Sequence, residues 1–191
     1  MRNLPLAVAI VLFSTSTPFV VAKDGREYKG KDGTRVVILP IRKWTREPGY
    51  KSYESRVEFY SPQHEMLCAL DYSSEDSEHG FGIVKAAWTP DNKYFVFSLT
   101  SSGGHQSWHF PTYFYSTQDS KIYTLDDYIE GSGISKGDFT LKAPNEVLTS
   151  VLREREEEVP VRFHLEKLVA KSHSTTRAVI CADANVIKPQ K

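Results

Sequence analysis

GIVKAAWTPDNKYFVFSL, residues 82–99, is the part of the chain in which strand and turn signals are clearest. Two apolar segments, Gly82–Trp88 and Tyr94–Leu99, flank the turn sequence TPDN at residues 89–92. Proline presets its φ angle in tight turns, and Asp or Asn side chains hydrogen-bond to the nearby backbone. The stretch therefore predicts a β-hairpin.

Further strand signals lie on both sides of this hairpin, at the spacing of about eight to twelve residues that is typical of all-β folds. No segment of about ten residues or more shows a helical period, and we expect a single helical turn at Asp126–Ile129. The other expected strands are Val36–Ile41, Arg56–Tyr60, Met66–Tyr72, Thr112–Ser116, Ile122–Leu125, Phe139–Leu141, Val147–Leu152, Val159–Leu165 and Ala178–Cys181.

The segment WTPDNKYFVFS, Trp88–Ser98, resembles the blade repeat of periplasmic β-propellers of the Tol-associated and prolyl-oligopeptidase type. The resemblance implies that Gly82–Leu125 supplies four strands in order, and it indicates binding rather than chemistry. We therefore expect an all-β fold: an antiparallel meander of about 9–11 short strands with a propeller-blade-like centre. A β-sandwich or a barrel is the alternative.

The N-terminus has the pattern of a secretory signal peptide. Arg2 precedes the apolar run Leu4–Phe13, and the small residue Ala22 allows cleavage before Lys23. The run is much shorter than the roughly 20 apolar residues of a membrane-spanning helix. We expect residues 1–22 to be removed, and residues 23–191 to form one β-rich domain in the periplasm or outside the cell, without stable membrane insertion.

Charge gives no reason to expect a nucleic-acid partner. The chain has 24 basic and 24 acidic residues, and cleavage would remove only Arg2 from this balance. The two cysteines, Cys68 and Cys181, both remain after cleavage. An even pair in an oxidising compartment predicts a disulfide, and two unconnected buried thiols are the alternative.

The Gly-rich loop Ser101–Pro111 is long for a hairpin and contains two histidines and a tryptophan. Long loops on a rigid sheet often carry function, so we interpret this one as a recognition surface. The alternative is structural, with the tryptophan at the edge of the core and the histidines bonded to the backbone. The expected contact residues are His105, Gln106, Trp108, His109, Tyr113 and Tyr115.

A metal site is a second hypothesis for this loop. Imidazole binds zinc or copper, and His105 and His109 could combine with an acidic residue such as Asp76 or Glu78. Those acids belong to the oxygen-rich segment Asp71–Gly80, which is otherwise typical of a solvated loop.

No catalytic motif is present: G-x-S-x-G is absent, and no phosphate-binding glycine loop opens a helix. The charge run Arg153–Glu158 is typical of a solvated hairpin tip. We therefore expect a non-enzymatic binding module without a cofactor, which recognises a protein or cell-envelope component, as inhibitor or immunity-type proteins do. A metal-binding protein or metal-assisted hydrolase is the alternative.

Overall fold

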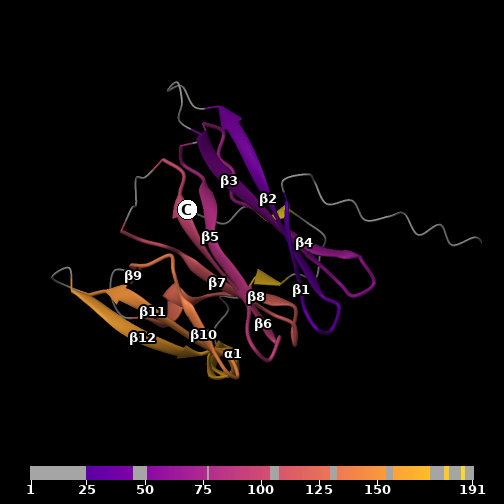
Figure 1. Ribbon diagram of the computed structural model, residues 1–191, viewed down its shortest axis with the longest axis vertical. Helices are drawn as coiled ribbons and strands as arrows, with labels where there is room; N and C mark the ends of the chain where they lie inside the picture. The colour runs from indigo at the N-terminus through magenta and orange to yellow at the C-terminus, as the bar shows by residue number, and fades with distance from the viewer. Residues whose placement is uncertain are drawn as a thin grey trace, which may run out of the picture.

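The computed structural model describes residues 25–44, 51–76, 78–103, 108–129, 133–153, 157–172, 179–180 and 186–187. These residues form three β-sheets, one 3₁₀ turn and one short α-helix, which confirms the all-β class (Figure 1). All strand pairs are antiparallel except the one between β14 and β4.

The first sheet has the strand order β1-β2-β3-β4-β14. Its longest strands, β2 and β3, pair along their whole length, from Arg35 opposite Tyr60 to Trp44 opposite Lys51. The strands are β1 (Arg26–Lys29), β2 (Arg35–Trp44), β3 (Lys51–Tyr60), β4 (Met66–Asp71) and β14 (Val186–Ile187).

The second sheet has the order β13-β8-β7-β6-β5, so four consecutive strands lie side by side, as expected for the centre of the chain. The predicted hairpin is confirmed: Trp88 pairs with Phe95, and the Asn92 N–H donates to the Thr89 carbonyl at 2.8 Å. The strands are β5 (Phe81–Trp88), β6 (Tyr94–Ser101), β7 (Thr112–Ser116), β8 (Lys121–Thr124) and β13 (Val179–Ile180).

The third sheet has the order β10-β11-β12, and β9 also pairs with β11. A 3₁₀ turn, η1, precedes the sheet at the predicted helical turn, and the helix α1 follows β12 directly. The elements are η1 (Leu125–Tyr128), β9 (Gly133–Ile134), β10 (Thr140–Lys142), β11 (Glu146–Leu152), β12 (Glu158–His164) and α1 (Leu165–Ser172).

The second sheet lies between the other two and buries both of its faces. Along β6, Phe95 and Phe97 belong to a core shared with the first sheet, whereas Tyr94 and Val96 belong to a core shared with the third sheet. This explains why Tyr94–Phe97 is an unbroken apolar run rather than an alternating one. Each sheet has open ends, so a layered sandwich describes the arrangement better than a closed barrel or propeller (Figure 1).

The structure contains 14 strands among its described residues, more than the 9–11 expected. The additions include β9 and β14, which have two residues each and depend on pairing with distant segments rather than on a local pattern. The predicted strand Val159–Leu165 ends one residue early, because Leu165 begins α1 and is buried in the core.

Several sequence predictions concern residues outside the described part of the chain. The signal peptide, residues 1–22, lies there, and so does Cys181. Cys68 is fully buried in β4. No described cysteine is free. The bridge to Cys181 stays a prediction. Among the described residues, no helix has the length and apolar character needed to cross a membrane.

Candidate binding site

The Gly-rich loop is described only in part. His105 and Gln106 lie outside the described residues, so their expected role in binding stays a prediction. Trp108 is 49% exposed and stacks on the ring of His109, with 5.6 Å between the ring centroids. An exposed indole of this kind provides contact area to a partner at low entropic cost.

Asp126, on η1, holds His109 in place. Its Oδ1 lies 2.9 Å from His109 Nε2, while the N–H groups of Thr112 and Ile134 each donate to this carboxylate at 3.2 Å. Gly133 permits the close approach, since a Cβ there would lie 2.6 Å from His109 Cδ2. The His109 ring is thus a fixed platform for Trp108.

The two tyrosines predicted as contact residues belong mainly to the core. Tyr113 stacks on Phe97, with 5.5 Å between centroids, and burial raises its pKa to about 12. Tyr115 is only 1% exposed and packs on Phe59, with 4.7 Å between centroids. Its expected place in the contact surface is corrected accordingly, because an alternating strand that is buried on both faces leaves this ring no access to solvent.

The acidic segment Asp71–Gly80 is organised by internal hydrogen bonds. The Asp76 carboxylate accepts from the Glu78 N–H at 3.0 Å and contacts the His79 ring, and these bonds hold its pKa well below the usual range. No group of three or more metal-ligating side chains occurs in the described parts of the chain. The metal hypothesis depends on His105 and therefore stays untested.

A buried carboxylate, which the sequence did not reveal, fixes the same segment. Glu54 on β3 is completely buried, and it accepts hydrogen bonds from the Ser74 N–H at 2.8 Å and the Gly80 N–H at 3.0 Å. The hydroxyls of Ser74 and Ser102 donate to it at 2.5 and 3.0 Å. Glu54 therefore ties the acidic segment and the start of the Gly-rich loop to the first sheet.

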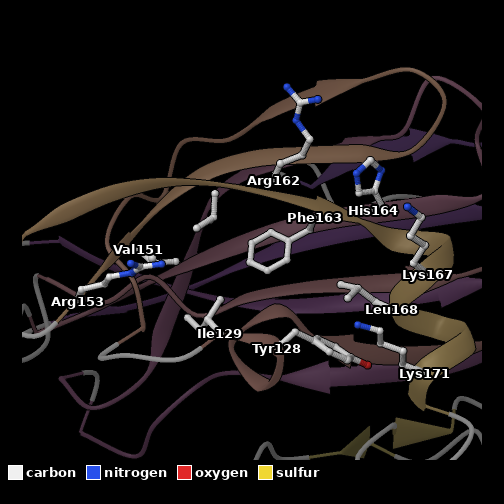
Figure 2. Close-up of a pocket in the computed structure, with 11 residues that line it drawn as sticks. Tyr128, Ile129, Val151, Arg153, Arg162, Phe163, His164, Lys167, Leu168 and Lys171 are labelled. Atoms are coloured by element: carbon white, nitrogen blue, oxygen red, sulfur yellow. The ribbon is translucent and has the colours of Figure 1, made fainter.

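A hollow of about 470 Å³ lies on the third sheet, where β12 meets η1 and α1 (Figure 2). Its apolar part includes Phe163, whose ring points into the hollow, and Leu168 from α1. We refer to it as the cationic hollow. Its lining residues are Tyr128, Ile129, Val151, Arg153, Val161, Arg162, Phe163, His164, Lys167, Leu168 and Lys171.

The helix α1 positions the two lysines that line the hollow. Leu165, Leu168 and Val169 share the buried side of α1, as expected for positions i, i+3 and i+4 of an amphipathic helix. Lys167 and Lys171 are four residues apart and therefore lie on one side of the helix, next to the hollow. Packing of α1 against the core thus fixes where these charges lie.

The charged side chains that line the hollow are all basic. Arg153, Arg162, Lys167 and Lys171 contribute cations, and none of the described residues lining the hollow is acidic. Glu146 partly compensates Arg162, with 3.7 Å between Oε2 and Nη1, and its Oε1 lies 3.3 Å from His164 Nδ1. Within the described chain, Arg153 and Lys167 form no ion pair.

Two guanidinium and two ammonium groups around an apolar floor can bind a ligand that combines anionic groups with apolar ones. The whole chain is electrically neutral by residue count, so this concentration of charge is local. Comparisons with protein-family models, with curated proteins and with solved structures find no match for this chain.

Proposed function

We propose that the protein is an exported, non-enzymatic binding module that recognises an anionic protein or cell-envelope component through the cationic hollow. The observation that carries the proposal is the set of cations around the apolar floor of Phe163 and Leu168, with no acidic residue among the described lining. Arg153 and Lys167, which form no ion pair within the described chain, lie next to apolar surface. Burying these two cations under a neutral partner would cost their solvation, so an acidic partner fits them best.

Trp108 provides a second contact in this proposal. Its exposed indole lies on the fixed His109 platform, and Gly133, which contacts that platform, begins β9 of the third sheet. We expect Trp108→Ala to weaken partner binding without lowering thermal stability, because the indole is half exposed in the free protein.

A charge-swap experiment tests the proposal. In the mature protein, Arg162→Glu/Lys167→Glu reverses two cations of the hollow, and Lys121→Glu/Lys142→Glu makes the same change in net charge elsewhere. The measurement is quantitative capture of binding partners from cell-envelope extracts, with thermal denaturation to check folding.

We expect a partner that binds the wild type and the control variant, and that loses at least tenfold in affinity for the hollow variant. Equal capture by both variants would refute the hollow as the binding site. Equal loss with both would mean that net charge, rather than the hollow, attracts the partner.

Export and the disulfide are tested by the intact mass of the protein recovered outside the cytoplasm. The proposal predicts a chain that starts at Lys23 and gains two hydrogens on reduction, as the Cys68–Cys181 bridge opens. A native mass spectrum of the same untagged sample tests the metal alternative, since stoichiometric zinc or copper would support a site built on His105 and His109.

A further inference from the structure

The strand β12 is the end strand of the third sheet and pairs only with β11 in the described structure. Residues in an antiparallel pair alternate between those that bond to the partner strand and those whose N–H and C=O point away. The backbone bonds just beyond each end of the pair show which residues are which. The Arg153 N–H donates to the Glu157 carbonyl at 3.0 Å, and the Leu165 N–H donates to the Asn145 carbonyl at 3.2 Å.

Both bonds give the same alternation. Since residues 157 and 165 bond to the partner side, the odd-numbered residues between them also bond to β11, and the even-numbered residues face outward. The Ser135 N–H, which donates to the Ser150 carbonyl at 2.9 Å, agrees with this, because Ser150 is paired with Pro160 and turns its carbonyl toward β9. The outer edge of β12 therefore carries the N–H groups of Arg162 and His164.

Pro160 fits this alternation, because a proline has no N–H and is accommodated where that position faces away from the sheet. It also limits the open edge. From Pro160 to His164, the edge has the carbonyls of Pro160 and Arg162 and the N–H groups of Arg162 and His164. In the described chain, no backbone hydrogen bond reaches these outer groups.

The cationic hollow extends along this edge. Val161 and Phe163 lie on the inner face of β12, and Arg162 and His164 on the outer face, yet all four line the same hollow. Figure 2 shows Phe163 and Arg162 on opposite sides of the strand. Since these four residues alternate between the two faces, the hollow that they line lies beside the edge of β12, where the outward N–H and C=O groups are.

We propose that an acidic, extended segment of a partner protein binds here by adding a strand to β12 along Pro160–His164. This rests on the proposed function, in which the cationic hollow is the binding site. The outward backbone groups supply hydrogen bonds, as in other cases of β-strand addition. The cations around the edge select a segment with carboxylates.

The alternation of the added strand predicts its sequence pattern. Side chains on one face of that strand lie beside Phe163 and Leu168, and those on the other face lie beside Arg162. The segment should therefore alternate apolar residues with Asp or Glu. A fully acidic segment would leave the apolar floor uncovered.

The probe is a fluorescein-labelled peptide of sequence EVEVEVE, with fluorescence anisotropy of the mature protein as the readout. A second peptide has the same side chains but N-methylated amides at alternate residues, which removes backbone donors on one edge and blocks strand pairing. A third peptide, KVKVKVK, tests the sign of the charge. Vesicles with anionic lipid and inorganic phosphate are tested as competitors.

Two variants at one position separate charge from backbone. Arg162→Gln removes the cation and keeps the outward N–H, and we expect about threefold weaker binding of EVEVEVE. Arg162→Pro removes both, and we expect about a further fivefold loss, since one hydrogen bond is missing. Circular dichroism checks that the proline variant stays folded, and the N-methylated peptide tests the backbone without any substitution.

Binding of EVEVEVE that N-methylation reduces at least tenfold supports strand addition. Equal binding of the N-methylated peptide would overturn strand addition and leave the proposed function standing. Anionic vesicles or phosphate could instead displace the peptide, and Arg162→Pro could bind it as tightly as Arg162→Gln does. That combined result would overturn strand addition in favour of a membrane surface or a small anion as the ligand. Binding of no probe, together with envelope capture that the charge-swap variant leaves unchanged, would overturn both proposals.

Discussion

Glu54 gives the sharpest test of how the structure is stabilised. Its carboxylate is completely buried and accepts four hydrogen bonds, two from backbone N–H groups and two from serine hydroxyls. The contact with Gly80 leaves no room for a larger residue, because a Cβ at Gly80 would lie 2.2 Å from Glu54 Oε1. Removing the carboxylate leaves the N–H groups of Ser74 and Gly80 without their acceptor.

The expected loss follows from these four bonds. A hydrogen bond to a charged group contributes about 1.5–3 kcal/mol, and a buried donor without an acceptor costs about 1–3 kcal/mol. These contributions are not additive, and the hydroxyls can turn to other acceptors, so the two backbone donors dominate. We expect Glu54→Ala to lower the free energy of unfolding by about 3–5 kcal/mol and Tm by about 10 °C.

Glu54→Gln serves as the milder variant. It keeps one carbonyl oxygen but places an NH₂ group near one of the donors, so we expect a loss of about 1–2 kcal/mol. The control is Glu65→Ala, which removes an exposed carboxylate from the turn between β3 and β4. The assay is urea denaturation at pH 7. A Glu54→Ala protein as stable as the Glu65→Ala control, with an unchanged m value, would show that the hydrogen bonds to Glu54 do not stabilise the fold.

Two further predictions concern pH. Tyr72 is buried, its hydroxyl has no hydrogen-bond partner among the described residues, and burial with the neighbouring Tyr113 raises its pKa well above 10. The stability that this raised pKa contributes is present below about pH 10 and is lost as the pH rises further. Urea denaturation of Tyr72→Phe should show unchanged or slightly higher stability at pH 7 and a weaker alkaline loss; a loss at pH 7 above about 1 kcal/mol would contradict this. Burial raises the pKa of Asp91, but hydrogen bonds from Thr89, Asn145 and the Lys93 N–H outweigh it and lower the pKa overall. This contribution is present above about pH 4 and is lost as the pH falls, so acid titration should show a weaker pH dependence for Asp91→Asn, and an unchanged one would refute the assignment.

The sequence predicted strands well where the order of apolar, polar and turn residues within a short segment determines the strand. The turn at residues 89–92 and the apolar segments on both sides of it form the expected β5–β6 hairpin. The alternation of Val161 and Phe163 with Arg162 and His164 likewise gives the inner and outer faces of β12. In both cases neighbouring residues alone carry the information.

The candidate site was not predicted, because tertiary contacts assemble it. Arg153 appeared as part of a solvated charge run, and α1 is too short to give a clear helical period. The spacing of Lys167 and Lys171, four residues apart on either side of Leu168, is a local signal that could have indicated a cationic side on a helix. Only the packing of α1 and η1 against β12 brings these charges to one hollow.

Site-specific photo-crosslinking at Pro160 identifies directly what binds along the outer edge of β12. A benzophenone amino acid at this exposed edge position would label whatever binds along β12, and the same group at Glu65 serves as the control. Mass spectrometry of the adduct identifies the labelled segment. We expect adducts from position 160 alone, on a protein segment that alternates acidic and apolar residues. Adducts of equal yield from both positions, or a segment without acidic residues, would contradict this expectation.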